Sequence, residues 1–324
     1  MRALVCKEFA PYDQLTVEEI DEPPVGEGFV MVDVKAAGVN FPDILLVEGK
    51  YQMKPDTPFV PGMEVAGVIS ALGEGVQGMK AGDRVIAATM LGGFAEKVPV
   101  PASQLVPMPD SMSFEEGAAL TTIYGTSYHA LKDRARLKEG ETVLVLGAAG
   151  GVGVATVQLA KAMGANVIAA ASSAEKLEFC KVNGADEVIN YAEEDLKARA
   201  KALTGGKGVD VVYDPVGGDY AEAALRASGW DARYLVVGFA AGPIPKIPLN
   251  LALLNARNIM GVFWGAWVGR EPRANAQNLK EIFDFYEAGH FKPQISAAYA
   301  LDDYARAFED LLNRRVKGKV VLTP

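Results

Sequence analysis

Two patterns of apolar residues divide the chain. In residues 1–124, short apolar or alternating runs are separated by turn residues, which is typical of many short strands. From residue 125 onward, apolar runs alternate with helical patterns, which predicts a parallel sheet with helices on both faces. The first pattern favours a small, partly open barrel. Its expected strands are 1–6, 15–20, 30–37, 64–72 and 84–87, with a short helix and loop over 40–50.

The second pattern gives a regular series of elements. Its expected strands are 143–146, 167–171, 187–189, 209–214, 234–237 and 259–263, and its expected helices are 126–131, 154–163, 174–183, 195–203 and 220–227. Ser113 and Glu116 have the spacing of a capping box, so a helix should follow them. A long helix is expected over 274–288.

The tail over 294–323 mixes strand, helix and a final strand over 319–322, and it most simply returns to the first domain. We therefore expect residues 1–124 and 268–324 to form one domain and residues 125–267 to form a second domain inserted into it.

The most informative stretch is the glycine-rich turn between the first expected strand and helix of the inserted domain. It reads Gly147-Ala-Ala-Gly150-Gly151-Val152-Gly153. Gly147 allows a sharp turn, Gly150 and Gly151 let backbone N–H groups approach a pyrophosphate, and Gly153 allows close helix packing. The spacing departs by one residue from strict GxGxxG, but strands and a helix flank it as a dinucleotide site requires. The alternative is a glycine-rich turn in an ordinary parallel sheet.

The end of the second strand of this unit indicates which dinucleotide is bound. NAD-binding domains hold the ribose with an acidic residue there, whereas this strand ends in alanines followed by Ser172 and Ser173. Two hydroxyls and Lys176 suit a 2′-phosphate, which a carboxylate would repel. Glu175 is the contrary feature and is expected to start a helix and point away. The sequence predicts NADPH, with a solvated Lys176 as the alternative.

Composition excludes several classes of partner. The chain of 324 residues has a net charge of −9, which argues against nucleic acid and anionic membranes. We see neither a signal peptide nor an apolar run that could span a bilayer. Two cysteines in different segments fit a reducing compartment, and we expect a cytoplasmic protein.

The whole chain resembles the zinc-free NADPH:quinone oxidoreductases (zeta-crystallin-like) of the medium-chain dehydrogenase/reductase superfamily. The stretches AAGVNFPD, PGMEVAG, AAGGVG and VINY carry the likeness; they begin at Ala36, Pro61, Ala148 and Val188. The resemblance implies an α/β fold: a Rossmann-type doubly wound parallel sheet domain inserted into a partly open β-barrel (GroES-like) catalytic domain.

Departures from the zinc-dependent branch of that superfamily remove its metal ligands. Asn40 and Met63 stand where those enzymes carry cysteine and histidine, and the third ligand position falls near Thr122. The histidines, His129 and His290, lie far from these segments in sequence. We expect no metal site.

The resemblance also implies roles for particular residues. Relatives use residues matching Lys176 and Tyr191 around the 2′-phosphate and one matching Thr126 at the nicotinamide. Asn40 and Tyr51 are the expected hydrogen-bond donors to the acceptor, and related enoyl-thioester reductases place a proton-donating tyrosine where Tyr51 stands. The alternatives are a pocket wall for Tyr51, a helix N-cap for Thr126 and a loop aromatic for Tyr191. Glu64 is expected to make structural hydrogen bonds.

Further cofactor contacts are expected after the late strands, where this architecture places its ligand crevice. Gly238, Phe239, Phe263 and Trp264 follow such strands, and their aromatic rings suit a flat acceptor. The alternative for these aromatics, as for Trp267, is packing in a core or a subunit interface.

The leading hypothesis is a metal-free, NADPH-dependent reductase of quinones or other α,β-unsaturated carbonyls. Hydride addition to such an acceptor leaves charge on a delocalised oxygen, which one or two donors stabilise without a metal. The first alternative is an enoyl-thioester reductase for short acyl-CoA, with Arg257, Arg270 and Arg273 as candidates for the CoA phosphates. The second is a non-enzymatic NADPH-binding protein. We expect a homodimer that pairs the strand over 258–263 across a two-fold axis.

Overall fold

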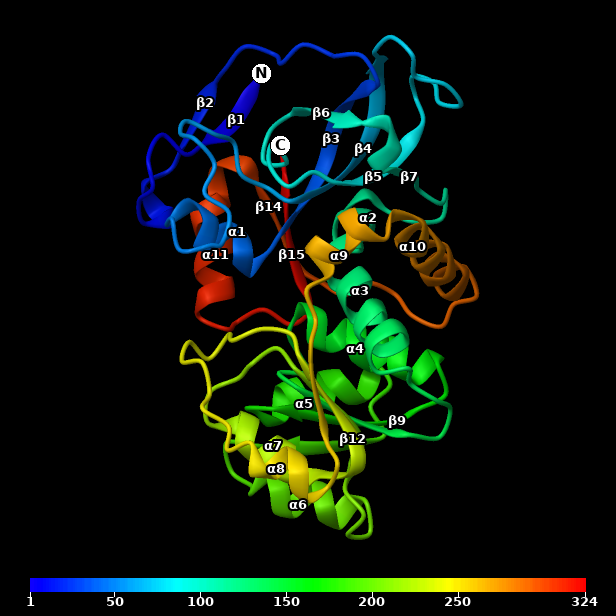
Figure 1. Cartoon of the computed structure of the whole chain (residues 1–324). Coiled ribbons are helices and arrows are strands. Elements are labelled where there is room, and N and C mark those ends of the chain that lie inside the picture. The colour runs from blue at the N-terminus through cyan, green and yellow to red at the C-terminus, as the bar shows by residue number, and fades with distance from the viewer. The chain divides into compact units, whose positions relative to one another are not determined.

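The computed structural model describes residues 1–324 and groups them into two compact units (Figure 1). Unit 1 contains Met1–Thr122 and Pro293–Pro324, and unit 2 contains Ile123–Lys292. The chain leaves unit 1, forms unit 2 and returns, as the tail pattern predicts. However, residues 268–292 group with unit 2 and not with unit 1. The cause is α10 (Pro272–Glu287), whose Glu281 accepts hydrogen bonds from Tyr128 at 2.6 Å and Lys132 at 2.5 Å.

Unit 1 is mainly β. Its larger sheet has the order β14-β15-β3-β4-β5-β7, with β6 also paired to β3. The strands are β3 (Phe29–Val39), β4 (Glu64–Leu72), β5 (Arg84–Ala88), β6 (Lys97–Pro101), β7 (Leu105–Pro107), β14 (Ile295–Ala300) and β15 (Lys319–Thr323). A separate pair joins β1 (Arg2–Val5) to β2 (Thr16–Glu19). The helices are α1 (Phe41–Val47), α2 (Phe114–Ala118) and α11 (Tyr304–Leu312).

The long strand β3 organises unit 1 because it pairs with β4, β6 and β15, all antiparallel. Its residues Val30, Val32 and Val34 alternate into the main apolar core. The pairing with β15 confirms that the tail returns to this unit. The capping box is also confirmed, because Ser113 Oγ accepts the Glu116 N–H at 3.2 Å and Glu116 Oε2 accepts the Ser113 N–H at 3.0 Å.

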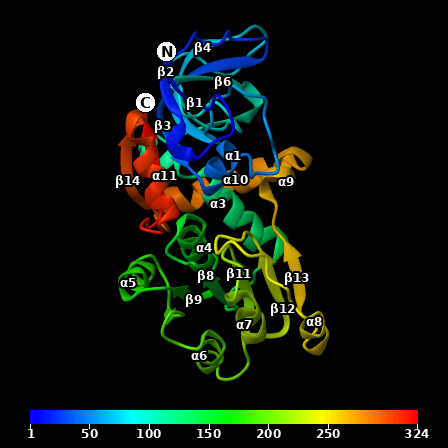
Figure 2. The ribbon, with the colours of Figure 1, turned by 90° about the vertical axis from the view of Figure 1, so that its left-hand side faces the viewer.

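Unit 2 is a doubly wound sheet of six strands in the order β10-β9-β8-β11-β12-β13, and every pair is parallel. The strands are β8 (Thr142–Leu146), β9 (Asn166–Ala171), β10 (Glu187–Asn190), β11 (Val209–Asp214), β12 (Ser228–Val236) and β13 (Asn258–Gly261). Helices α4 (Gly151–Ala162) and α5 (Ala174–Val182) cover one face, and α6 (Leu196–Leu203) and α7 (Tyr220–Ala227) cover the other (Figure 2). The predicted fold class is confirmed.

The sequence patterns do not predict four short elements: β6, β7, α8 (Asn250–Leu254) and α9 (Trp264–Arg270). β6 contains Pro99 and Pro101, which argue against a strand, and β7 has three residues. α9 begins Trp-Gly and contains Gly265 and Gly269, which lower helix propensity. The helix α3 (Thr121–Tyr128) starts earlier than expected and continues into a π-helical turn, His129–Arg134.

Candidate functional site

The glycine turn connects β8 to α4 in unit 2. Gly147 has a φ of +57°, a left-handed conformation that glycine adopts without strain. A Cβ atom at Gly153 would lie 2.3 Å from the Gly147 carbonyl oxygen and 2.7 Å from the Ala148 Cα, both backbone atoms. Gly147 and Gly153 therefore have the steric roles that the sequence predicts.

The N-terminus of α4 has no side-chain cap. Gly150 is the N-cap residue and cannot supply one. The first N–H groups of a helix have no partner within the helix, and its N-terminus carries a partial positive charge. A Cβ at Gly150 would meet only the Gly147 oxygen, at 3.4 Å, so the approach to this terminus is open. The arrangement fits a pyrophosphate.

Three buried hydroxyl groups form a hydrogen-bond network at the Val152 carbonyl, in the first turn of α4. The hydroxyls of Ser127 and Thr156 lie 3.1 and 2.7 Å from the Val152 carbonyl oxygen, and the Tyr213 hydroxyl lies 3.1 Å from Ser127 Oγ. These residues belong to α3, α4 and β11, so the network ties the turn to its neighbours. Burial raises the pKa of Tyr213 to about 12, which keeps its phenol protonated. No local motif marks these residues, so the sequence alone does not single them out.

Thr126, the expected nicotinamide contact, lies half-buried within α3. Because the helix begins at Thr121, Thr126 is not its N-cap, and that alternative is wrong.

The predicted 2′-phosphate residues gather at the carboxyl ends of β9 and β10. Ser172 follows β9 directly and is exposed. Ser173 is the N-cap of α5, and its Oγ accepts the Lys176 N–H at 3.4 Å. The Tyr191 N–H donates to the Ala171 carbonyl at 3.2 Å, which brings Tyr191 beside the tip of β9. The structure thus brings these four predicted residues to one edge of the sheet.

The late-strand aromatics divide into two kinds. Phe263 is 62% exposed, and Phe239 is 38% exposed beside Gly217. Trp264 instead packs in unit 2: its indole Nε1–H donates to Asn275 Oδ1 at 3.2 Å, and a Cβ at Gly125 would lie 2.7 Å from its ring. For Trp264 the geometry agrees with the packing alternative.

Asp214 is the last residue of β11, and its side chain organises the turn that follows. Gly238, which follows β12, lies beside this turn. Asp214 Oδ1 accepts the N–H groups of Val216 and Gly217, both at 2.8 Å, and the Tyr234 hydroxyl bonds its other oxygen. A Cβ at Gly238 would lie 3.3 Å from the Pro215 carbonyl oxygen. Asp214 therefore shapes the backbone at this strand end.

Unit 1 contains a buried group of polar side chains that we call the Lys319 cluster: Asn40, Asp43, Glu64, Thr121 and Lys319. Lys319 Nζ donates to Glu64 Oε1 and to Asn40 Oδ1, both at 2.5 Å. Thr121 Oγ1 donates to Glu64 Oε2 at 2.7 Å. Glu64 is fully buried and Lys319 is 3% exposed, so this is an ion pair away from water. The expected structural role of Glu64 agrees with these bonds.

Both the amide nitrogen and the amide oxygen of the Asn40 side chain already have hydrogen-bond partners. Its Nδ2 donates to the Gly38 carbonyl at 3.3 Å and to Glu64 Oε1 at 2.9 Å, and its Oδ1 accepts from Lys319. Its backbone N–H donates to Asp43 Oδ2 at 2.8 Å, which completes a capping box on α1. Both amide hydrogens of Asn40 are thus bonded within unit 1. This corrects the expectation that Asn40 offers a free donor to a substrate.

The two carboxyl groups of the cluster shift in opposite directions. Burial raises the pKa of Asp43 to about 7, and its Oδ1 has no hydrogen-bond partner. Burial also works to raise the pKa of Glu64, but the Lys319 ammonium and the hydrogen bonds outweigh it and hold that pKa below its usual value. Sequence reasoning missed Asp43 and Lys319. The Asn-x-x-Asp spacing was a usable signal for Asp43, as was the single charge opening an apolar strand for Lys319.

Tyr51 is half-buried and packs against the apolar core of unit 1. Burial, with a smaller contribution from the charge of Asp43, raises the pKa of its phenol. The phenol therefore stays protonated near neutral pH and is a hydrogen-bond donor.

No three histidine, cysteine, aspartate or glutamate side chains are grouped so that they could hold a metal ion. His129 Nδ1 lies 2.8 Å from Asp133 Oδ2, and its ring stacks on Trp267 at a centroid distance of 4.1 Å. His129 is thus a packed residue. None of the helices is both long and apolar enough to cross a membrane.

Two protein-family models match the chain. Residues 26–110 match the alcohol dehydrogenase GroES-like domain, and residues 151–282 match the zinc-binding dehydrogenase family. The first match lies in unit 1 and the second in unit 2.

Similar proteins cover the chain from end to end. Quinone oxidoreductase-like protein 2 homolog from Nematostella vectensis is 40% identical over 99% of this chain and 88% of its own. The solved structure of Escherichia coli quinone oxidoreductase complexed with NADPH has a TM-score of 0.91 and 31% identity over 100% of both chains. The quinone oxidoreductase of Thermus thermophilus, solved alone and with NADPH, has a TM-score of 0.87 and 37% identity over 100% of both chains.

Proposed function

Because the chain belongs to the quinone oxidoreductase family of the medium-chain dehydrogenase/reductase superfamily, we propose that it is an NADPH-dependent reductase of quinones or other α,β-unsaturated carbonyl compounds. The observation that carries this proposal is the uncapped N-terminus of α4 behind the glycine turn. It is supported by the absence of an acid at the tip of β9, where Ser172 and Ser173 stand. The NADPH complexes of its relatives add support.

The cofactor site is formed by backbone and side chains of unit 2. The N–H groups of Gly151 to Gly153 bind the pyrophosphate, and the buried hydroxyls below Val152 keep them in place. Ser172, Lys176 and Tyr191 surround the 2′-phosphate, where hydroxyls and an ammonium give charge-assisted hydrogen bonds. Thr126, Gly238, Phe239 and Phe263 contact the remainder. Bound NADPH supplies the hydride.

Hydride addition to the acceptor requires no metal, and a protonated donor near the acceptor oxygen adds a small further stabilisation. A quinone or enone that gains a hydride carries negative charge on a conjugated oxygen, which a neutral O–H group stabilises. Tyr51 is the donor that we assign, because its phenol is protonated at neutral pH and its raised pKa leaves that unchanged. Asn40 serves as a positioning residue, since it caps α1 and orients Lys319 and Glu64.

The test is steady-state NADPH oxidation with 1,4-benzoquinone and with crotonyl-CoA, for wild type and Tyr51→Phe. We expect benzoquinone to be the better acceptor. We expect the variant to retain most of its quinone activity, because the delocalised anion needs little help from an acid. Thr89→Val serves as a matched control, since the side-chain hydroxyl of Thr89 donates to the Gly62 carbonyl in unit 1.

Two other outcomes would replace the proposal. If crotonyl-CoA is reduced faster than benzoquinone and Tyr51→Phe loses most of that crotonyl-CoA activity, the protein is an enoyl-thioester reductase. Arg257, one candidate for the CoA phosphates, already bonds Ser228 and the Leu251 carbonyl, at 2.9 and 2.7 Å. NADPH binding with no turnover of either acceptor would indicate a non-enzymatic cofactor-binding protein.

We also propose a homodimer that pairs β13 with its copy. β13 is the last strand of its sheet, so one of its edges lacks a strand partner. Apolar side chains are exposed on it and on α8: Ile259 is 43%, Leu253 80% and Leu254 63% exposed. Sedimentation should give a dimeric mass for wild type and a monomeric mass for Ile259→Lys. A monomeric wild type would refute this pairing.

A reducing compartment such as the cytoplasm is the proposed location. Cys6 and Cys180 are both free and buried, and they lie in different units. Fractionation of the source cells, with detection of the native chain, would test this assignment.

A further inference from the structure

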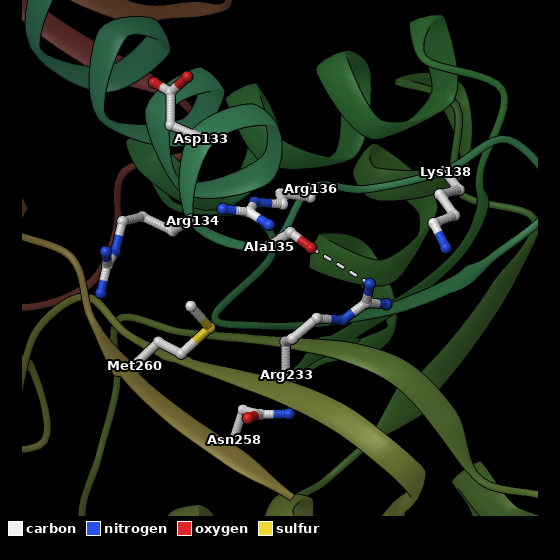
Figure 3. A pocket seen from close by; sticks show the side chains of 8 residues that line it. All are labelled: Asp133, Arg134, Ala135, Arg136, Lys138, Arg233, Asn258 and Met260. Carbon is white, nitrogen blue, oxygen red and sulfur yellow. Dashed lines mark hydrogen bonds between the residues drawn. The ribbon is translucent and has the colours of Figure 1, made fainter.

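The segment that follows β13 packs along α3, the helix that carries Thr126. Arg134, in the π-helical turn that continues α3, donates its Nε–H to the Gly261 carbonyl at 3.0 Å, and its side chain extends toward β13 (Figure 3). Further along the segment, the ring of Trp267 in α9 stacks on His129 at a centroid distance of 4.1 Å. These two contacts hold the start and the end of the segment against α3 and its turn.

Between these contacts, Trp264 lies directly on Gly125 in the interior of α3. A Cβ atom at Gly125 would lie 2.7 Å from Cζ2 and 2.8 Å from Cε2 of the indole, which is closer than real Cβ atoms come to other heavy atoms. The indole Nε1–H donates to Asn275 Oδ1 at 3.2 Å, which holds the ring in this orientation. Glycine weakens the interior of a helix, so its presence here is explained by the room that it leaves for Trp264.

Thr126 follows this glycine and keeps its hydroxyl unbonded. On the next two residues, the Ser127 hydroxyl lies 3.1 Å from the Val152 carbonyl oxygen, and the Tyr128 hydroxyl donates to Glu281 at 2.6 Å. The Thr126 hydroxyl is half-buried and forms no hydrogen bond with the chain. It is therefore available to a ligand, and its place is set by a helix whose neighbouring side chains are already bonded.

The order of the strands relates these contacts to the two ends of the cofactor. The residues proposed for the 2′-phosphate follow β9, and the glycine turn follows β8. In the same direction, the carboxyl edge of the sheet continues to β11, β12 and β13. Phe263 follows β13, is 62% exposed and immediately precedes Trp264. A cofactor that starts at β9 and crosses β8 therefore directs its nicotinamide toward Phe263 and Thr126.

We propose that Trp264 is a positioning residue for the nicotinamide of NADPH. By packing on Gly125 it fixes Thr126 in α3 and, through the chain, Phe263 after β13. Trp264 acts through these two residues, since its own indole packs on Gly125 and bonds Asn275. This role rests on the proposed function and concerns the reacting end of the same cofactor site. A misplacement of about 1 Å at the reacting atoms costs about a hundredfold in rate, so small shifts of α3 against α9 should be measurable.

The test compares two ligands, NADPH and adenosine 2′,5′-bisphosphate, which carries the 2′-phosphate but no nicotinamide. Calorimetric titration gives the affinity of the full chain for each ligand in wild type, Gly125→Ala and Gly125→Ala/Trp264→Phe. In Gly125→Ala the added Cβ displaces the indole, so we expect NADPH to bind several-fold more weakly and the bisphosphate to bind as it does to wild type. Phenylalanine lacks the indole atoms nearest the added Cβ, so the double variant should regain most of the NADPH affinity.

Turnover gives a second readout of the same role. With 1,4-benzoquinone, Gly125→Ala should lower kcat about tenfold and leave the KM for the quinone nearly unchanged, because the hydride donor is misplaced while the acceptor still binds. Gly269→Ala is the matched control, since that glycine lies in α9 with nothing within 4 Å of its Cβ position. It should behave as wild type does in all of these measurements.

Three results would overturn the inference: NADPH affinity and kcat in Gly125→Ala equal to those of wild type, an equal loss of affinity for both ligands, or no recovery in the double variant. An equal loss for both ligands would mean that Trp264 supports only the fold of unit 2. Failure of the proposed function gives a different result, because wild type itself would then bind no NADPH or reduce no acceptor.

Discussion

The glycine turn of unit 2 and the Lys319 cluster of unit 1 differ in whether their hydrogen-bond donors already have partners. At the turn, the first N–H groups of α4 have no side-chain acceptor. In the cluster, Lys319, Asn40 and Thr121 all donate to Glu64, and Lys319 also donates to Asn40. Open donors bind a ligand, whereas closed ones stabilise a fold. Substitutions at the turn should therefore change cofactor binding, and substitutions in the cluster should change stability.

The largest effect is expected from Lys319→Met. It leaves the Glu64 carboxylate buried without its cation and Asn40 Oδ1 without a donor, and loss of one partner of a buried pair costs about 3–5 kcal/mol. Urea unfolding measures the loss. Lys207→Met, at an exposed lysine without an ion pair, should change stability by less than about 0.5 kcal/mol. A similar small loss for Lys319→Met would mean that the cluster is not structural.

The next effect is a dependence of stability on pH caused by Asp43. Its pKa rises from 3.8 to about 7 on folding, so the folded state holds a proton that the unfolded state has released. Stability should therefore fall as pH rises from about 4 to 7, by roughly 4 kcal/mol at most, and then level off. The difference in unfolding free energy between wild type and Asp43→Asn, measured across that range, isolates this effect. A constant difference would contradict it.

Glu64 should affect the pH dependence of stability in the opposite direction from Asp43, and over a lower pH range. Because its folded pKa is depressed, it contributes stability above its unfolded pKa that is lost as pH falls through the folded value. Measurements from pH 4 to 7 thus separate the two carboxyl groups.

At the turn, Gly153→Ala should weaken NADPH binding at least tenfold and destabilise the chain by about 1–3 kcal/mol. The added Cβ would meet the Gly147 oxygen at 2.3 Å, and backbone atoms must move to admit it. Gly269→Ala is the matched control because that helical glycine has nothing within 4 Å of its Cβ position. Unchanged NADPH affinity in Gly153→Ala would exclude the turn as the binding site.

The smallest effects distinguish two adjacent serines. Ser173→Ala removes the N-cap of α5 and should cost about 0.5–1 kcal/mol of stability. Ser172→Ala should leave stability unchanged and weaken NADPH binding, because Ser172 is exposed beyond β9. Thermal unfolding with and without NADPH gives both values. Equal loss of stability in the two variants would contradict this division.

Features that depend on residues close together in the chain are predicted from the sequence, whereas features that depend on contacts between distant segments are not. The alternation of strands and helices predicts unit 2, and the glycine turn lies within one short segment. Strand β6 was missed because its two prolines mask a strand that pairs with β3. The second domain boundary was expected at residue 267 but lies after Lys292, because α10 packs in unit 2 through contacts that the sequence does not encode locally.

The Lys319 cluster was missed for the same physical reason. Asn40, Glu64 and Lys319 come from α1, β4 and β15, and only the folded unit brings them together. Asn40 therefore seemed available to a substrate from its position in the motif, while its actual partners lie elsewhere in the chain. Composition and spacing reveal a candidate donor, but the structure decides whether its hydrogens are already bonded.

We propose that unit 2 selects NADPH for a reductase of conjugated carbonyls. A comparison of kcat/KM for NADPH and NADH with 1,4-benzoquinone, in wild type and in Ser172→Ala/Lys176→Ala, tests this directly. We expect at least tenfold preference for NADPH in wild type, and loss of most of that preference in the variant. Equal use of NADH by wild type, or no turnover with either cofactor, would contradict it.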